Sequence, residues 1–523
     1  MKIERTRNAM RNIRVGMVLR VYQTVVPFLM RTAMIHFMGV EYLGLNGLFS
    51  SVLHLLSLAE LGVGSAMVFS MYKPIAEDDS ERICALMSLY RTYYRVIGLV
   101  IGVAGLLMTP FVPHLISGEL PQGLNLYWLY WLNLGATVLS YWLFAYRNCL
   151  LVAHQRMDVV SKITLLTNAV QQVVQLLILI YVKNYYLYVI VQLFSTAMNN
   201  VLTGLVTMRR YPQYQPRGKL EKAEIRQLNR KIGDLFTVKV GTVVLNYGDT
   251  IIISMFLGLT VLAVYQNYFF ILTAVITAIE MIISSITAGL GNSFITESRE
   301  KNYRDMLKFS FLFTWLIGVC VCCFLGMYQP FMEIWVGREL MQGFGLVVCL
   351  AMYFYAYTLN RLLSIYKDAA GLWHQDRFNP LVTALVNLVL NLLLVKPMGL
   401  SGVLLSTVIS FGAITIPWQL HNLFTLFFDR ALRKEYVRLL AKNLAATALA
   451  SVLVCLICAQ IHASPWVELV LSMLIAVAVP NLVFLLLLHR DASFRPSIQF
   501  LDRLTKGKLK LEKRLFPSKK AAA

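Results

Sequence analysis

Stretches of about 20 mainly apolar residues recur from one end of the chain to the other. A helix of that length crosses the hydrocarbon core of a bilayer, so a chain built from such stretches is a polytopic membrane protein. Only 14% of its 523 residues are charged and 58% are hydrophobic, which leaves too few charges for a mostly wet surface. We predict an all-α fold with about 14 transmembrane helices. The predicted spans are 14–38, 43–71, 88–112, 124–150, 159–181, 185–208, 232–257, 262–290, 307–328, 341–366, 379–395, 399–425, 437–460 and 466–488.

Lysine and arginine are concentrated in alternate connections between these spans. They gather before the first span, after each even-numbered span from the fourth to the twelfth, and in the tail after the last. Retained positive charge marks the cytoplasmic side of a membrane protein, so both termini are expected in the cytoplasm. A basic face beside anionic lipid accounts for the net charge of +21. We therefore expect membrane lipids, and no nucleic acid, as partners.

The chain also resembles itself at a shift of 220 residues. Each copy holds an even number of spans, so both copies enter the membrane from the same face and form a parallel repeat. A glutamate inside a membrane helix is rare, which makes the match of Glu60 with Glu280 informative. The other matched pairs are Asn46 with Gln266, Phe49 with Phe269, and Ser65 with Ser285.

The repeat predicts two six-helix lobes followed by two additional helices. The longest connection between spans is basic and separates the two copies, so it is expected to link the lobes on the cytoplasmic side. The predicted domains are an N-terminal lobe (1–208), an interlobe linker (209–231), a C-terminal lobe (232–425), two further transmembrane helices (437–488) and a basic cytoplasmic tail (489–520).

Basic residues inside the spans are candidates for binding a substrate. Ionisable groups at membrane depth normally face a cavity or one another. Two arginines lie on nearly the same face of the first span, about three turns apart, and the planar guanidinium suits a phosphate or pyrophosphate. The alternative for these two is that their side chains reach to lipid headgroups. The candidates are Arg20, Arg31, Lys239 and Arg361.

Acidic residues inside the spans are candidates for coupling or gating. A carboxylate at this depth can carry a proton or sodium ion, or it can only pair with the basic residues of the cavity. The candidates are Glu60, Asp249 and Glu280. The eight cysteines lie mostly in apolar spans without metal-ligand spacing, so we predict packing roles for them. We expect no metal site, no cofactor and no catalytic residues.

Three stretches carry a resemblance to a known family: Gly39–Leu45, Ser57–Gly64, and Gly399–Gly402 with Ser406 and Thr407. In these stretches the chain resembles the Wzx-type polysaccharide flippases of the multidrug/oligosaccharidyl-lipid/polysaccharide (MOP) exporter superfamily. The resemblance implies movement of an undecaprenyl-pyrophosphate-linked oligosaccharide across a bacterial inner membrane by alternating access. It also implies a polysaccharide polymerase as a partner, and that the helices of 437–488 could form a groove for the lipid tail.

Two other functions are weighed against this one. A multidrug or organic-cation antiporter of the same superfamily should have an acidic and aromatic pocket, whereas four of the seven candidate residues named above are basic. A membrane glycosyltransferase or ligase usually presents catalytic carboxylates on a large outer loop, and the outer connections here are short and poor in acids. We therefore expect a transporter rather than an enzyme.

Overall fold

The computed structural model describes residues 5–60, 62–118, 120–121, 123–504 and 512. Every regular element within them is a helix, which confirms the predicted all-α fold. The described residues divide into two compact units. Unit 1 runs up to Asn267 and includes Pro380–Leu400, and unit 2 comprises Tyr268–Asn379 and the residues from Ser401 onwards. The two units are defined by packing within the structure and not by the sequence repeat. The predicted lobe boundaries therefore remain a prediction.

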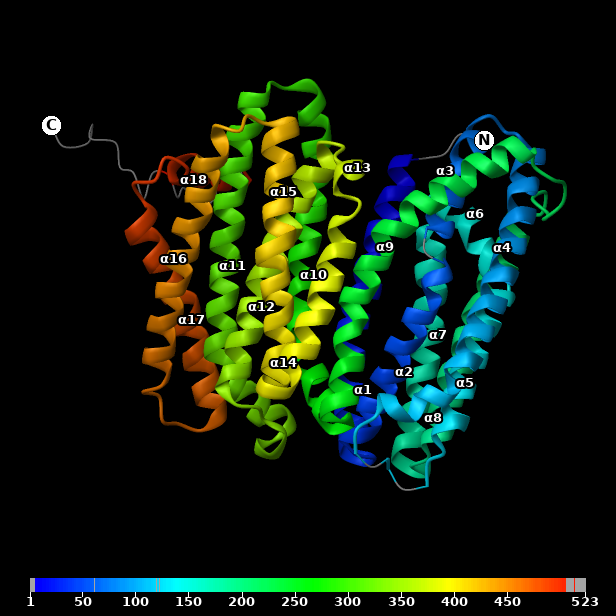
Figure 1. Ribbon diagram of the computed structural model, residues 1–523, viewed down its shortest axis with the longest axis horizontal. Helices are drawn as coiled ribbons and strands as arrows, with labels where there is room; N and C mark the ends of the chain where they lie inside the picture. The colour runs from blue at the N-terminus through cyan, green and yellow to red at the C-terminus, as the bar shows by residue number, and fades with distance from the viewer. Residues whose placement is uncertain (1–4, 61, 119, 122, 505–511, 513–523) are drawn as a thin grey trace. The chain divides into compact units, whose positions relative to one another are not determined.

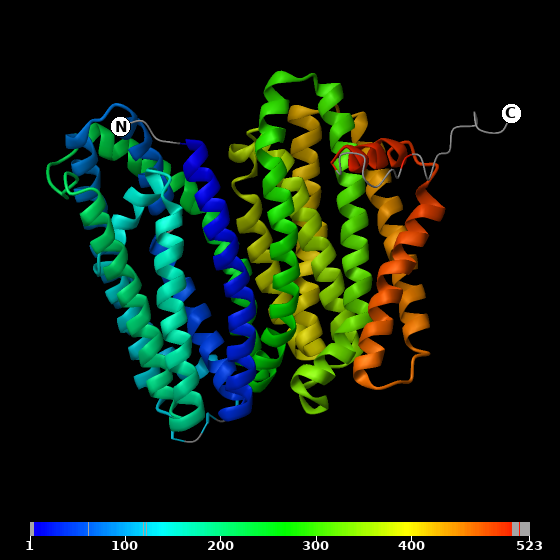
Figure 2. The ribbon, with the colours of Figure 1, turned by 180° about the vertical axis from the view of Figure 1, so that it is seen from behind.

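Unit 1 is a bundle of long helices with short irregular segments between them (Figure 1). Polar side chains cap several of these helices: Asp79, for example, accepts a hydrogen bond from the Arg82 amide at 3.0 Å. Helix α1 packs along α7, as Figure 2 shows. The helices are α1 (Arg5–Phe37), α2 (Val40–Leu56), α3 (Val63–Ala76), α4 (Ser80–Met108), α5 (Leu126–Trp142), α6 (Asn148–Ala153), α7 (Met157–Leu177), α8 (Tyr185–Arg210) and α9 (Lys222–Leu257), with η1 (Ser57–Glu60), η2 (Thr109–Leu115), η3 (Ala145–Arg147) and η4 (Ile178–Val182).

Two predicted spans of unit 1 are broken in the middle. The span 43–71 consists of α2 and α3 joined by η1, and Gly62 takes a left-handed conformation (φ 90°) at the junction. The span 124–150 consists of α5 and α6 joined by η3, with Phe144 at φ 57°. Irregular backbone at membrane depth persists where it is buried in protein or lines a cavity. These two breaks therefore mark where a polar site can lie.

The remaining helices lie wholly or partly in unit 2. Helix α10 (Leu259–Thr296) begins in unit 1 and continues into unit 2, and α14 (Asn379–Ser410) is kinked at Gly399 (φ 56°, ψ −134°), next to the boundary between the units. The others are α11 (Arg299–Val336), α12 (Phe344–Ala369), α13 (Trp373–Asp376), α15 (Ile416–Asn422), α16 (Leu432–Cys458), α17 (Pro465–Leu488) and α18 (Phe494–Leu504), with η5 (Arg338–Leu340), η6 (Phe411–Thr415) and η7 (Leu423–Phe427).

Eleven helical segments among the described residues are long and apolar enough to cross a membrane. A multi-pass membrane protein is therefore confirmed. The broken pairs α2–α3 and α5–α6 do not qualify by length, and Trp373–Phe427 counts as one segment although Gly399 divides it. These three places account for the difference from the predicted fourteen, and that exact number remains a prediction.

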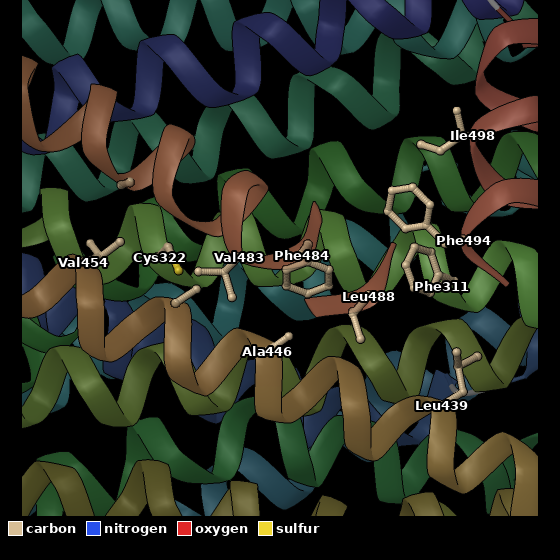
Figure 3. Packing of buried hydrophobic residues seen from close by; sticks show 12 residues of the cluster. Phe311, Cys322, Leu439, Ala446, Val454, Val483, Phe484, Leu488, Phe494 and Ile498 are labelled. Carbon is tan, nitrogen blue, oxygen red and sulfur yellow. The ribbon is translucent and has the colours of Figure 1, made fainter. Parts of the chain in front are cut away.

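Helices α16 and α17 pack into the core of unit 2 against α11 (Figure 3). Phe311, Cys322 and Phe484 are fully buried there. A Cβ on Gly318 would lie 2.7 Å from the Thr447 hydroxyl, so this glycine allows the helices to approach closely. The predicted helices of 437–488 are thus an integral part of unit 2.

Helix α18 runs across the ends of its neighbours rather than along them (Figures 1 and 2). Its Phe494 and Ile498 are buried in the same core. The turn before α18 is held by Asp491, which accepts hydrogen bonds from Lys442 Nζ at 2.7 Å and the Ser493 amide at 3.0 Å. Burial acts to raise the pKa of Asp491, but these hydrogen bonds outweigh burial and hold that pKa below its usual range.

Replacing Gly241 with alanine should destabilise unit 1, because α9 and the start of α14 touch through their backbones at this point. A Cβ on Gly241 would lie 2.3 Å from the Pro380 carbonyl carbon, and backbone cannot move aside as a side chain can. Overpacking of this kind costs about 1–3 kcal/mol. The matched control is Gly248→Ala on the same helix, where a Cβ would meet nothing within 4 Å. Thermal unfolding in detergent should show a lower midpoint for the first variant only, and equal midpoints would contradict this packing.

Candidate functional site

A pocket of about 670 Å³ lies in unit 1 beside both helix breaks. Its volume falls in the usual range for small-molecule sites, which is roughly 300–1,000 Å³. Helix α3 supplies one wall, α4 and the η3–α6 segment supply others, and α9 contributes a single lysine. The lining residues are Glu60, Gly64, Ser65, Val68, Phe69, Tyr72, Tyr90, Tyr94, Ala145, Asn148, Cys149, Val152 and Lys239.

Glu60 ends η1 and accepts two hydrogen bonds from buried tyrosines. Tyr94 donates to its Oε1 at 2.5 Å, and Tyr141 donates to its Oε2 at 2.7 Å. Tyr90 in turn donates to the Tyr94 hydroxyl at 2.8 Å. Phenol donors stabilise a negative charge on the carboxylate without neutralising it. Glu60 is thus a carboxylate held in place at the edge of the pocket by three tyrosines from α4 and α5.

Lys239 brings a positive charge to the same pocket from α9. Its ammonium nitrogen lies 3.2 Å from the Ser65 hydroxyl, and no carboxylate of the described residues lies within ion-pair distance of it. An ammonium has three donor hydrogens, so most of its capacity is available to a ligand. The structure therefore brings together two of the predicted residues, one from each predicted class.

Glu280 and Arg361, in unit 2, form an ion pair. Arg361 Nε lies 2.9 Å from Glu280 Oε1, and the Tyr357 hydroxyl donates to the same oxygen at 3.4 Å. These positions lie 220 residues after Glu60 and Tyr141. In both repeats the glutamate is thus contacted from the equivalent position, which is Tyr141 in the first repeat and Arg361 in the second.

Asp249 is buried in unit 1 between α9 and the first half of α14. Asn391 Nδ2 donates to Asp249 Oδ1 at 2.6 Å and also lies 3.2 Å from Asn387 Oδ1. The Asn391 side-chain oxygen is buried without a hydrogen-bond partner among the described residues. The side-chain oxygen atoms of Asp249, Asn387 and Asn391 therefore lie close together. Oxygen atoms are the ligands that a hard cation prefers.

The two arginines of α1 lie apart from the pocket. Arg31 is half-buried, and its Nη1 donates to Oδ1 of the buried Asn267 at 3.0 Å. Arg20 is exposed, and the structure shows no ion pair for it within the described residues. Neither lines the pocket that holds Lys239. The predicted site residues thus fall into four places: the pocket, the Glu280–Arg361 pair, the Asp249 cluster and the face of α1.

Sequence reasoning missed the neutral partners of these charges. The tyrosines around Glu60 carry no charge and lie in apolar spans, where aromatic residues are ordinary. Asn391 had a signal, because the repeat aligns Asn387 and Asn391 with Asn168 and Gln172 after a one-residue slip. The side chain of Ser285, which the repeat matches with Ser65, lies outside the described residues.

The fold and the site define a class of protein. A membrane-spanning bundle whose helices break beside a pocket with opposite charges is the architecture of a transporter. A family model described as polysaccharide biosynthesis protein matches residues 9–289, more than half of the chain. The chain belongs to that family. No curated protein matches the sequence significantly.

Solved structures of MOP-superfamily transporters share the fold. The lipid II flippase MurJ in an inward closed conformation is similar over 91% of this chain and 98% of its own, with a TM-score of 0.65 and 11% identity. An inward-facing multidrug resistance MATE family transporter is similar over 81% and 98%, with a TM-score of 0.60 and 16% identity. A MOP superfamily transporter from Pyrococcus furiosus, described as having a binding pocket of reverse polarity, is similar over 82% and 96%, with a TM-score of 0.51 and 16% identity.

The family match, together with these likenesses of fold, confirms the predicted superfamily. Identities of 11–16% show the fold alone. The family and the similar structures are transporters and flippases rather than enzymes, which is consistent with the expectation that this chain is not an enzyme.

Proposed function

We propose that this protein is a flippase that moves an undecaprenyl-pyrophosphate-linked oligosaccharide repeat unit across the bacterial inner membrane by alternating access. The observation that carries the proposal is Lys239, an ammonium without a carboxylate partner in the described residues, in a pocket beside two broken helices. An uncompensated positive charge at that depth calls for an anionic cargo. Membership of the polysaccharide biosynthesis family supplies the chemical context for that anion.

The anionic groups of the cargo are proposed to meet the basic residues predicted from the sequence. Arg31 and Arg20 lie on α1, Lys239 on α9 and Arg361 on α12, so no one helix carries all the positive charge. A guanidinium can bind two phosphate oxygens at once and keeps its charge when desolvated. Movement of the cargo would exchange some of these contacts for others. The similarity to a lipid II flippase supports a lipid-linked cargo.

Transport is proposed to be coupled to a proton or sodium ion at the acidic residues. Asp249 is the strongest candidate, because it is buried and its neighbours Asn387 and Asn391 offer further oxygen atoms. Glu60 and Glu280 have equivalent places in the repeat and are proposed to act in gating. Their partners are phenols in one repeat and a guanidinium in the other.

A second candidate is export of organic cations. The aromatic lining of the pocket and Glu60 favour it, since a cation binds over aromatic rings and beside a carboxylate. Lys239 opposes it, because an ammonium in the same pocket repels a cationic ligand. We therefore rank this function below that of a flippase. A membrane glycosyltransferase or ligase ranks lower still, and we propose no enzymatic role.

Reconstitution of the purified protein in liposomes tests the proposal directly. A fluorescent undecaprenyl-pyrophosphate-linked oligosaccharide should cross the bilayer, while a cationic dye should not. Arg31→Lys should lower the rate several-fold, because lysine keeps the charge but loses a donor worth about 0.5–1.5 kcal/mol. The matched control is Lys183→Gln, which lies in the short connection before α8. Dye export without lipid movement would overturn the flippase assignment.

The cargo also implies a partner. Once the repeat unit reaches the outer leaflet, an enzyme of the polymerase class must join it to others, so we propose that a polysaccharide polymerase consumes the product. The proposed location is the bacterial inner membrane, with both chain termini in the cytoplasm.

A further inference from the structure

Two aromatic rings on α3, Phe69 and Tyr72, line the pocket of unit 1, and the Lys231 ammonium lies 5.0 Å from the centroid of the Phe69 ring. Phe69 and Tyr72 are 62% and 46% exposed, and their ring centroids are 6.3 Å apart in an edge-to-face arrangement. Both line the same pocket as Lys239. The C–H bonds on one face of a sugar ring are weakly positive, so that face packs well against the negative face of an aromatic ring. Tyr72 and the face of Phe69 opposite Lys231 therefore offer a surface for a sugar.

Polar groups beside these rings can bind the hydroxyls of a sugar. Ser65 and Asn148 line the pocket and offer both donors and acceptors. Each oxygen of Glu60 accepts one phenol hydrogen bond and retains capacity for another. A pocket with aromatic walls and neutral or acidic hydrogen-bonding groups matches a polyhydroxylated ring better than it matches an apolar lipid chain.

The charges in the pocket select among sugars. Lys239 donates to Ser65 and has no carboxylate partner among the described residues, so an anionic group on the ligand would complete its contacts. Glu60 limits how much negative charge the pocket accepts, because a group with several charges would be repelled by the carboxylate. A sugar with a single carboxylate can pair with Lys239, and Glu60 repels it less than it repels a pyrophosphate, which carries more negative charge.

We infer that this pocket binds an acidic sugar of the cargo, with the ring against Phe69 and Tyr72 and its carboxylate on Lys239. The inference rests on the proposed function, since it takes the ligand to be part of the transported oligosaccharide. It assigns the sugar to this pocket and leaves the carrier's pyrophosphate to the predicted arginines, which lie outside it. The anion that binds Lys239 could also be the pyrophosphate of the lipid carrier, so the experiment also measures binding of inorganic pyrophosphate.

Calorimetric titration of the full-length protein in lipid nanodiscs distinguishes these ligands. Methyl glucuronide and methyl glucoside differ only in a carboxylate at one position, and inorganic pyrophosphate represents the carrier. The glucuronide should bind about tenfold more tightly than the glucoside, the difference that one charge-assisted hydrogen bond supplies. Lys239→Gln should remove this difference, and Lys239→Arg should retain it. Tyr72→Leu should weaken both glycosides.

Lys183→Gln is the matched control, because it removes a lysine of the same unit that does not line the pocket. Unfolding midpoints of all variants establish that the protein is folded. Equal binding of the two glycosides would overturn the inference, and so would Lys239-dependent binding of pyrophosphate alone. Binding is measured without transport, so a protein that binds the glucuronide but moves no lipid-linked cargo would refute the proposed function and leave the pocket assignment intact.

Discussion

Asp249→Asn should abolish the dependence of transport on an ion gradient and lower the driven rate at least tenfold. The carboxylate is buried and accepts a hydrogen bond of 2.6 Å from Asn391. Asparagine has the same size but no negative charge, so it can neither take up a proton nor balance a sodium ion. Interactions of a charged group are worth about 1.5–3 kcal/mol, which corresponds to roughly 10- to 150-fold in binding of the coupling ion.

The measurement is transport in liposomes under an imposed proton gradient and, separately, an imposed sodium gradient. The gradient that drives the wild-type protein identifies the ion, and Asp249→Asn should respond to neither. Asn391→Ala should cause a smaller loss, because it removes a neighbour of the carboxylate but leaves the charge. Glu468→Gln, in the first turn of α17, is the matched control. A normal response of Asp249→Asn to the gradient would exclude this residue as the coupling site.

Arg361→Tyr should lower transport about tenfold, since it removes a positive charge proposed to bind the cargo. The substitution places in the second repeat the residue that the first repeat has at Tyr141. A tyrosine could still donate to Glu280, so the variant separates two roles of Arg361: holding the glutamate and binding an anion. Arg361→Lys should retain part of the rate, because it keeps the charge.

Folding should be little affected by these changes. The side chains of Arg361 and Glu280 are 44% and 31% exposed, and ion pairs with that exposure contribute at most about 1 kcal/mol. Arg338→Gln is the matched control, since Arg338 forms an ion pair with Glu333 at 2.7 Å outside the candidate site. Wild-type transport by Arg361→Tyr would mean that Arg361 only positions Glu280 and does not bind cargo.

The sequence predicted the helical, membrane-spanning character of the chain because that character is a local property. In a bilayer each span must satisfy its own backbone hydrogen bonds, so a sufficiently long apolar run is a helix whatever it packs against. The breaks at η1 and η3 escaped prediction because each contains only one charged residue, Glu60 or Arg147, within an otherwise mainly apolar run. Gly62 was the one visible cue, since a left-handed residue is needed there.

The charged candidates were also visible in the sequence, because charge inside a span is costly and therefore rare. The repeat further showed that Glu60 and Glu280 have equivalent positions. Only the tertiary structure decided what each charge meets. Tyr94 is 34 residues from Glu60 and Asn391 is 142 residues from Asp249. These partners are neutral residues on other helices, and nothing in their local sequence distinguishes them from residues that only pack. The sequence alone thus determined that the chain crosses the membrane many times with charges inside it, whereas packing between distant helices decided that Glu60 and Lys239 share a pocket and that Arg31 lies outside it.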